Sequence, residues 1–229
     1  MEFTINLGSA TNTDDAEGEV IATSDLRPSD AQIVEGMQGF LGEIMQVPPQ
    51  FSAVKIDGQR AYKLARAGEQ IEIAARPLLV EELILADRPT PDTAVLEMTC
   101  GKGGYVRAIA RDLGAVLGCY GHVAHLRRIW SGPFDLEHAV TLEQIESFAK
   151  TAEIGQFLRP LEVGLTDLPQ GTTNAEGAAK LRNGNPAICF TKAEYGDEIW
   201  VSYEGKAQAI GRYKSGEIHP ARVILQHES

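Results

Sequence analysis

The chain has 229 residues, 43% of them hydrophobic, with 21 basic and 32 acidic side chains and a formal net charge of −11. Such a length and apolar content predict a globular protein, with two domains favoured over one. Three widely spaced cysteines indicate neither a disulfide framework nor a zinc cluster. Without a signal-peptide pattern or a run of about 20 apolar residues, a soluble, cytoplasmic protein with no membrane partner is expected.

The charges are unevenly distributed along the chain. Residues 51–132 carry 11 of the 21 basic side chains with 9 acidic ones, whereas residues 1–50 carry 1 basic and 9 acidic. Binding to nucleic acid depends on the local field, so the acidic total does not exclude an RNA partner. The alternative is a solvated surface, because most charge runs are only that.

The first part of the chain predicts two strands and a helix. Residues 3–7 alternate between apolar and polar, which is the period of a strand, and the polar turn TNTDDAEG leads to a second strand around residues 20–22. In PSDAQIVEGMQGFLG, Ser29 and Gln32 form a capping box, and apolar residues follow at helical spacing until Gly42.

The middle of the chain alternates between helices and strands. The prolines of QVPPQF predict an extended path, and a short basic helix is expected from about Gly58 to Ala67. RPLLVEELILAD and TAVLEMTC predict two strands. A further helix is predicted to follow Tyr105 and end near Gly118, and its apolar face consists of Val106, Ile109, Ala110, Leu113 and Leu117.

The last part of the chain changes character near residue 163. Before it, HVAHLRRIWSGPF predicts a strand, and Thr141 with Gln144 predicts the start of a helix. After it, glycine turns separate the short apolar segments NPAICF, DEIWVSY, KAQAIGRY and ARVIL, which predicts a small β-rich domain. The residues of the helix that are expected to face inward are Leu142, Ile145 and Phe148.

The stretch KGGYVRAIARDLG, residues 102–114, places a Gly-Gly turn between a strand and a helix. Free N–H groups at such a turn suit an anion, but the stretch matches neither common phosphate-loop pattern, so no nucleotide cofactor is predicted. A plain tight turn is the alternative. Tyr105 and Arg107 would offer a stacking face to a base and a rigid fork to a carboxylate.

Two further groups of side chains invite a functional interpretation. FSAVKIDGQRAYKLARAG mixes cations with aromatic residues, as surfaces that contact phosphates and bases do, although an amphipathic surface helix explains it too. His122 and His125 have no nearby Cys or carboxylate that would complete a zinc site. Asp14 and Asp15 are adjacent on a polar turn, so they are expected to point apart into solvent.

Three segments resemble the TruB-type tRNA pseudouridine synthases: VPPQFSAVKIDGQRAYKLARAG, KGGYVRAIARDLG and AHLRRIWSGPF, in this order. LGSATNTDDAEGEV resembles the segment just upstream of them in that family. The resemblance implies an α+β fold, a mixed, mostly antiparallel sheet flanked by helices. It also implies a catalytic domain over residues 1–162, incomplete at its N-terminus, and a small PUA-like RNA-binding domain over residues 163–229.

The resemblance implies that uridine 55 in the T-loop of tRNA is isomerised to pseudouridine without a cofactor. An aspartate attacks, the glycosidic bond breaks, the uracil of the flipped-out nucleotide rotates, and a carbon–carbon bond forms. The partner is therefore the T-arm of tRNA, and nothing in the sequence demands more than a monomer. The catalytic residues implied are Tyr105 against the base, Arg107 beside the nucleophile and Leu126 at the pocket wall. The RNA-binding residues expected are Ser52, Lys55, Arg60, Lys63, Arg66, Lys102, Arg127 and Arg128.

The nucleophile itself is not found. In the family it lies in G-x-x-D-P-x-A-x-G, and none of the eleven aspartates here has that context, while Met1 lies where the family usually has an active-site tyrosine. The chain is therefore expected to make no pseudouridine alone. Arg107 is expected to lack a compensating charge. The sheet that begins at Phe3 is expected to have an open edge and exposed apolar surface, which would make the isolated chain aggregation-prone.

Two other hypotheses remain at this stage. One is a non-catalytic homologue that binds or remodels tRNA, and the other is an acidic protein-interaction module without RNA affinity. If the gene encodes the aspartate motif in frame before Met1, the enzyme is favoured over the non-catalytic homologue. If T-arm RNA binds with the salt dependence of phosphate contacts, the protein-interaction module is excluded.

Overall fold

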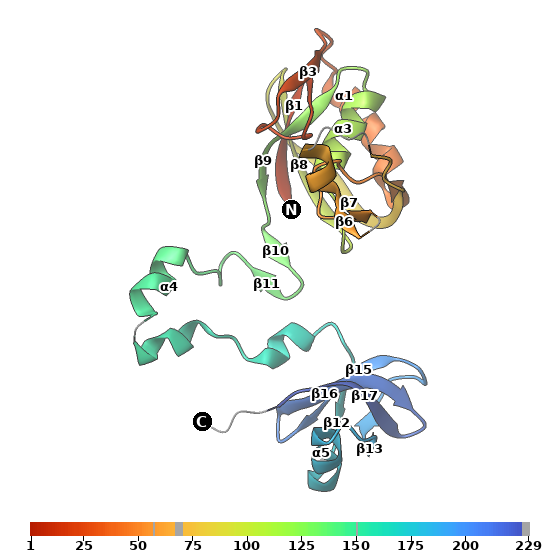
Figure 1. Ribbon diagram of the computed structural model, residues 1–229, viewed down its shortest axis with the longest axis vertical. Helices are drawn as coiled ribbons and strands as arrows, with labels where there is room; N and C mark the ends of the chain where they lie inside the picture. The colour runs from red at the N-terminus through yellow and green to blue at the C-terminus, as the bar shows by residue number, and fades with distance from the viewer. Residues whose placement is uncertain (57, 67–70, 150, 226–229) are drawn as a thin grey trace. The chain divides into compact units, whose positions relative to one another are not determined.

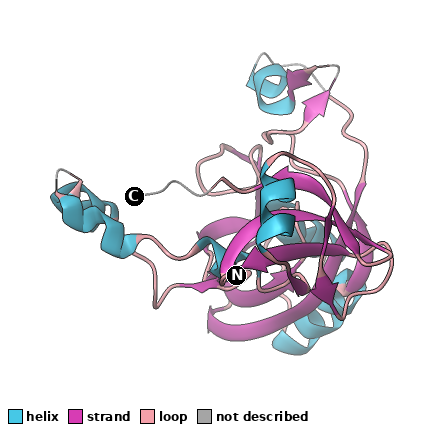
Figure 2. Ribbon diagram, turned by 90° about the horizontal axis from the view of Figure 1, so that it is seen from below, coloured by secondary structure: helices cyan, strands magenta, loops and turns pink. Residues whose placement is uncertain are grey.

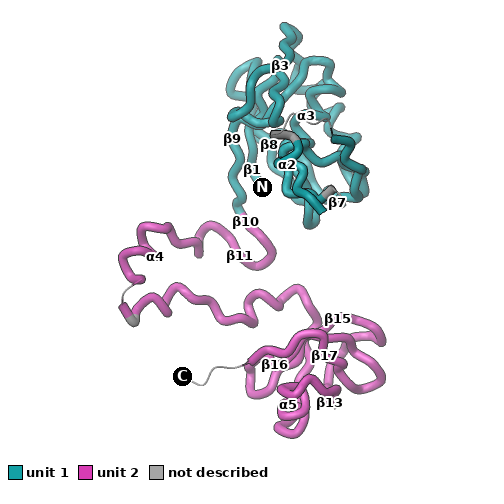
Figure 3. The backbone as a smooth tube through the Cα atoms, viewed as in Figure 1, with its two compact units in different colours: residues 1–129 teal, residues 130–229 magenta. Residues whose placement is uncertain are grey.

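A computed structural model describes residues 1–56, 58–66, 71–149 and 151–225. The chain divides into two compact units, Met1–Ile129 and Trp130–Ser229, which Figure 3 colours teal and magenta. The sequence placed the boundary between catalytic and RNA-binding domains at residue 162, so residues 130–162 fall in the second unit rather than the first. The division of function between domains stays a prediction.

The first unit is built on a five-stranded antiparallel sheet (Figure 1). In spatial order its strands are β4 (Gly42–Gln46), β7 (Arg76–Thr90), β8 (Thr93–Cys100), β1 (Glu2–Leu7) and β9 (Gly121–Arg127). Strands also provide most of the regular structure in the described residues of the chain, as Figure 2 shows in magenta.

The strand that contains Phe3 lies inside this sheet and not at its edge. β1 pairs with β8 on one side and with β9 on the other, and the side chains of Phe3 and Ile5 are fully buried. Among the described residues, the outer strands of this sheet are β4 and β9. That the sheet has an open, aggregation-prone edge stays a prediction. The sequence alone did not place β1 inside the sheet, because strand order depends on pairings between distant segments and not on the alternating pattern of the strand itself.

Two helices pack against the sheet and against each other. α1 (Asp30–Met37) begins at Ser29, where the predicted capping box with Gln32 is present, and it contacts β7. α3 (Val106–Val116) packs on β9 and β1 and lies beside α1 (Figure 1). The apolar face predicted for α3 is confirmed, because its buried side chains include Val106, Ile109, Ala110 and Leu113.

Gly114 allows α3 to approach β9 unusually closely. A Cβ atom added to Gly114 would overlap with main-chain atoms of Tyr120 and Gly121. The N–H groups of Cys119 and Tyr120 both donate to the Gly114 carbonyl, at 3.0 and 3.1 Å. The end of α3 is therefore fastened directly to the strand that follows it.

Two small hairpins extend from the sheet of the first unit. One consists of β2 (Ser9–Thr11) and β3 (Val20–Thr23), and its turn contains the two adjacent aspartates. The other consists of β5 (Lys55–Ile56) and β6 (Gln59–Arg60) and leads into α2 (Ala61–Arg66). The predicted helix is thus confirmed but starts later than Gly58, and Ala67 lies outside the described residues.

The second unit begins with short elements that bury little. These are β10 (Trp130–Ser131), β11 (Phe134–Asp135), α4 (Leu142–Phe148) and two 3₁₀ helices, η2 (Ala152–Phe157) and η3 (Leu161–Leu165). The capping box of Thr141 with Gln144 is confirmed. The inward orientation of Leu142 is not, because α4 has no buried residue and the side chain of Leu142 is 78% exposed. Ile145 and Phe148 are partly covered, and the Phe148 ring packs edge to face on that of Phe157 at 5.3 Å.

The rest of the second unit is a six-stranded sheet with one helix. In spatial order the strands are β13 (Ala187–Ile188), β17 (Glu217–Val223), β16 (Lys206–Lys214), β15 (Glu198–Tyr203), β12 (Gln170–Thr172) and β14 (Phe190–Thr191). β12 and β15 run parallel, and the other pairs are antiparallel. The predicted β-rich domain is confirmed, but the sequence missed β12 and α5 (Ala175–Arg182), whose Leu181 is buried in the core.

All three cysteines are free thiols, and burial raises the pKa of each above its ordinary value. In the described part of the chain, no helix combines the length and the apolar character needed to cross a bilayer.

Candidate active site

A hollow of about 560 Å³ lies where the β2–β3 turn, the segment after β4 and the start of α3 meet. The structure brings Tyr105 and Arg107, the two residues singled out in the sequence, to this one hollow. Its described lining residues are Thr13, Asp15, Glu17, Phe51, Ser52, Ala53, Tyr62, Tyr105 and Arg107.

Tyr105 and Arg107 share the hollow because the chain changes conformation between them. Tyr105 is the N-cap of α3 and is extended, with φ −107° and ψ 106°, whereas Arg107 lies in the first helical turn. The Tyr105 side chain is half-buried and packs against a small apolar cluster of Val54, Ala61 and Ile73. One wall of the hollow thus carries an aromatic ring beside a cation.

The guanidinium of Arg107 is held by three acceptors. Its Nη1 donates to the Thr13 carbonyl at 3.1 Å and to Asp15 Oδ2 at 2.9 Å, and its Nη2 donates to the Phe51 carbonyl at 2.8 Å. The prediction that Arg107 has no compensating charge is therefore wrong. The β2–β3 turn folds over the start of α3 and supplies a carboxylate from 92 residues away.

Asp15 is held in place by its own turn as well as by Arg107. Thr13 Oγ1 donates to Asp15 Oδ1 at 2.6 Å, the Glu17 N–H donates to the same oxygen at 3.2 Å, and Thr11 Oγ1 donates to the Asp15 carbonyl at 2.7 Å. One carboxylate oxygen thus serves the turn and the other serves Arg107. Such double use fixes the orientation of Asp15.

Asp14 forms a second, parallel ion pair. It has a left-handed backbone, φ 61°, and its Oδ2 lies 3.3 Å from Nη1 of Arg111, one helical turn beyond Arg107. Burial raises the pKa of Asp14, and the positive charges of Arg111 and Arg107 offset only part of this rise. Both aspartates meet arginines of α3, so the predicted solvent exposure of this pair is wrong: the Asp14 and Asp15 side chains are only 15% and 24% exposed.

The segment that walls the hollow is fastened to α2. The N–H groups of Tyr62 and Ala61 donate to the carbonyls of Ser52 and Val54, at 3.0 and 2.7 Å. Ser52 is 3% exposed, and its hydroxyl has no hydrogen-bond partner among the described residues. A buried hydroxyl without a partner is costly, and where one lies beside a hollow it invites a ligand.

Gln46, a residue not singled out in the sequence, holds the main chain of Tyr105. Its side chain is 4% exposed, Oε1 accepts from the Tyr105 N–H at 2.9 Å, and Nε2 donates to the Tyr105 carbonyl at 3.1 Å. The two residues are 59 positions apart.

Comparisons with known proteins identify the family. Residues 2–106 match the TruB family pseudouridylate synthase N-terminal domain, and residues 107–166 match the tRNA pseudouridylate synthase B C-terminal domain. A protein of Ruegeria pomeroyi named tRNA pseudouridine synthase B is 68% identical over 227 residues, covering 99% of this chain and 75% of that protein. The chain belongs to the TruB family of pseudouridylate synthases.

A more distant relative agrees with this assignment. The tRNA pseudouridine synthase B of Bradyrhizobium diazoefficiens is 41% identical over 230 residues, with 97% of this chain and 67% of that protein covered. A chain of a solved Cbf5–Nop10–Gar1 complex matches with a TM-score of 0.70 at 19% identity. The match covers 98% of this chain and 64% of the Cbf5-complex chain, and it shows likeness of fold alone.

The other residues expected from the TruB resemblance lie in several places. Leu126 lies on β9 opposite Phe3 and is 48% exposed, and it is not among the described residues that line the hollow. The side chain of Arg66 lies outside the described part of the chain. The remaining predicted RNA-binding cations are all exposed: Lys55, Arg60, Lys63, Lys102, Arg127 and Arg128.

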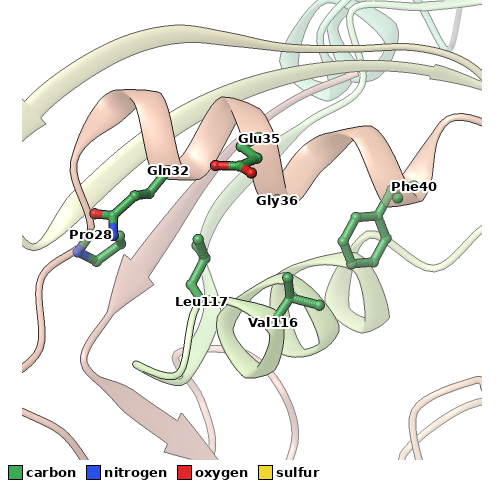
Figure 4. A pocket seen from close by; sticks show the side chains of 8 residues that line it. Pro28, Gln32, Glu35, Gly36, Phe40, Val116 and Leu117 are labelled. Carbon is green, nitrogen blue, oxygen red and sulfur yellow. The ribbon is translucent and has the colours of Figure 1, made fainter.

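A second hollow of about 500 Å³ lies between α1 and α3 of this TruB-family chain (Figure 4). Figure 4 shows Val116 and Leu117 of the α3 end facing Gly36 and Phe40. Glu35 is the only charged residue among its described lining residues, so these residues offer no cation to a phosphate or a carboxylate, whereas the first hollow has Arg107. The hollow at Tyr105 and Arg107 is therefore the better candidate for RNA.

Sequence reasoning missed Asp15, the burial of Ser52 and the role of Gln46. The alternation of threonine and aspartate in TNTDDAEG was a usable signal, because Thr and Asp side chains often satisfy each other within a turn. Gln46 gave no comparable signal, since its contact joins segments far apart in the sequence.

Proposed function

We propose that this chain carries the base-binding site of a tRNA pseudouridine synthase that isomerises uridine 55 in the T-loop. The observation that carries the proposal is that Tyr105 and Arg107 line one hollow together with Phe51 and Ser52. The flipped uracil lies against Tyr105, and Arg107 holds the carboxylate that reacts. Leu126 and the exposed cations remain proposed contacts.

The size and lining of the hollow support a single nucleobase. Sites for small ligands measure about 300–1,000 Å³, and this hollow lies within that range at about 560 Å³. Extruding a base from its stack costs a few kcal/mol, which stacking on an aromatic ring and hydrogen bonds to the base edge recover. Tyr105 supplies the ring, and the Ser52 hydroxyl is available for the edge.

The nucleophile is proposed to be an aspartate that is not among these 229 residues. Asp15 is a poor candidate, because both of its oxygens already accept hydrogen bonds from Thr13, Glu17 and Arg107. Its role is to hold Arg107 in place, so that the guanidinium is already oriented when the reacting carboxylate faces it. The pKa of that carboxylate would be lowered by the same charge.

A tritium-release assay tests the proposal. The new carbon–carbon bond forms at C5 of uracil and displaces the hydrogen there, so RNA tritiated at C5 releases tritium on turnover. We expect the 229-residue chain to bind T-arm RNA without releasing tritium. Release at position 55 would refute the absence of the nucleophile, while the lack of any binding would refute the base-binding site itself.

The alternative function is a homologue that binds or remodels tRNA without chemistry. Its support is the same missing aspartate context. Joining the chain to an N-terminal segment of a 68% identical relative distinguishes the two: restored tritium release supports the enzyme, whereas tight RNA binding without release supports the binder.

A further inference from the structure

Gln46 connects the two walls of the hollow. It is the last residue of β4, and the chain that continues from it forms the wall that contains Phe51 and Ser52. Its carboxamide reaches across to Tyr105, which belongs to the opposite wall. Both hydrogen-bonding ends of the amide are used, as a buried amide requires.

The contact falls at the point where the conformation of Tyr105 is otherwise weakly determined. The Tyr105 side chain makes no capping hydrogen bond to α3, and Gly103, two residues before Tyr105, has φ +87°, a conformation that glycine adopts easily. The Tyr105 carbonyl already accepts from Ala108 and Ile109 of the first helical turn, at 3.1 and 3.2 Å. The Tyr105 N–H has Gln46 Oε1 as its acceptor, so Gln46 sets where the extended chain ends and the helix begins.

We propose that Gln46 is a positioning residue for the base: by holding the main chain of Tyr105, it fixes the directions in which Tyr105 and Arg107 enter the hollow. The inference rests on the proposed function, since it concerns the base that the hollow receives. Without the two hydrogen bonds, the start of α3 is free to shift, and the aromatic ring no longer lies at a fixed distance from the cation.

Gln46→Met tests this inference, because methionine has a similar volume but makes neither hydrogen bond. The full 229-residue chain is titrated with two T-arm RNAs, one with uridine at position 55 and one with an abasic residue there. The dissociation constant of the abasic RNA divided by that of the uridine RNA isolates the contribution of the base. We expect this ratio to fall about tenfold in Gln46→Met, as when a stacked base loses its aromatic partner, while binding of the abasic RNA is unchanged.

Gln38→Met is the matched control. Gln38 is exposed, and its side-chain Nε2 donates to the Val34 carbonyl at 3.2 Å, one turn back in the same helical region. Its substitution should leave the ratio unchanged. A wild-type ratio above one that Gln46→Met preserves would overturn the inference alone, whereas no RNA binding by the wild type would overturn the proposed function and the inference with it.

Gln46→Glu supplies a readout that a merely structural role would not move. A neutral glutamic acid can accept from the Tyr105 N–H and donate its O–H to the Tyr105 carbonyl, as the amide does, but a carboxylate cannot donate. Burial raises the pKa of such a group above its ordinary value of about 4.3. We expect the ratio to be low at pH 8 and to recover towards wild type at pH 5, with the wild type measured at both values. A pH-independent ratio equal to wild type would contradict the inference, even if Gln46→Met does not fold.

Discussion

Asp15 Oδ2 lies 2.9 Å from Arg107 Nη1, although 92 residues separate the two in the chain. Each side chain is about one quarter exposed, so the pair is partly shielded from water without being sealed. The same guanidinium donates to two main-chain carbonyls, and the same carboxylate accepts from its own turn. The Asp15–Arg107 pair is thus a fixed part of the hollow.

Asp15→Asn should weaken both the fold and the site. The substitution removes the charge that faces Arg107 and leaves a half-buried cation, which we expect to lower the free energy of unfolding by about 1–2 kcal/mol, less than for a fully buried pair. Urea unfolding measures this change. Asp25→Asn, on an exposed loop, is the control and should change stability by less than about 0.5 kcal/mol. Equal effects of the two substitutions would show that the Asp15–Arg107 pair contributes nothing.

Asp14 should make stability depend on pH in an unusual direction. Because its pKa is raised above 3.8 in the folded chain, the folded state binds this proton more tightly than the unfolded state does. The free energy of unfolding contributed by Asp14 therefore falls as pH rises from 3.8 through the raised pKa, and the loss is complete above it.

Urea unfolding of the wild type and of Asp14→Asn at several pH values isolates this contribution, since the variant cannot ionise at this position. The stability of the wild type relative to the variant should decrease as pH rises through the window. A difference that stays constant or increases would mean that Arg111 and Arg107 outweigh burial.

Ser52→Ala should not destabilise the chain. The Ser52 hydroxyl is buried without a partner among the described residues, so its removal relieves a desolvation cost and leaves no group unsatisfied. We expect an unchanged or slightly higher urea midpoint together with weaker binding of uridine-containing T-arm RNA. Thr11→Val is the contrasting control: it removes the 2.7 Å hydrogen bond to the Asp15 carbonyl and should cost about 1 kcal/mol.

Gly114→Ala should destabilise the first unit more than its small volume suggests. The added methyl group meets the main chain of Tyr120 and Gly121, which cannot move aside as a side chain would, so the helix and β9 must separate. We expect a loss of about 1–3 kcal/mol in urea unfolding. Gly39→Ala, where a Cβ meets nothing within 4 Å, provides the comparison and should change little.

Lys63→Ala should reduce the salt dependence of T-arm binding. With about four phosphate contacts, log K against log [salt] should have a slope of about −3 to −4, and the loss of one contact should flatten it by about 0.7–0.9. Arg159→Ala removes an exposed cation outside the predicted contact surface and should leave the slope unchanged. An unaltered slope in Lys63→Ala would remove this residue from the RNA contacts.

Local patterns predicted the elements of this fold well, because each depends on residues close in sequence. The capping boxes at Ser29 and Thr141 and the apolar face of α3 all lie within one or two helical turns. α5 was missed because alanine and glycine make up most of its buried face, which leaves little hydrophobic contrast. The position of β1 inside the sheet was missed because strand order is set by long-range pairing.

The candidate site, like the fold, was predicted in part: two of its residues were expected, but the long-range contacts that hold them were not. Tyr105 and Arg107 were expected at one site because of the TruB resemblance, since residues two apart in a helix do not share a face. Their partners could not be inferred from sequence, since Asp15 and Gln46 approach them from 92 and 59 residues away. A pair of aspartates on a polar turn most often faces solvent, and only the folding of that turn over α3 gives Asp15 its partner.

Arg107 has a consequence for the order of assembly. Its three acceptors lie 94, 92 and 56 residues away in two segments of the chain, so the hollow closes only after two large loops have been closed. The conformational entropy of loop closure is lost before such contacts add any stability. Contacts of this kind therefore form later than local helices and hairpins. We therefore expect amide protons around Thr13 and Phe51 to gain protection against hydrogen exchange late during refolding. Binding of a nucleobase would then report that the first unit has finished folding.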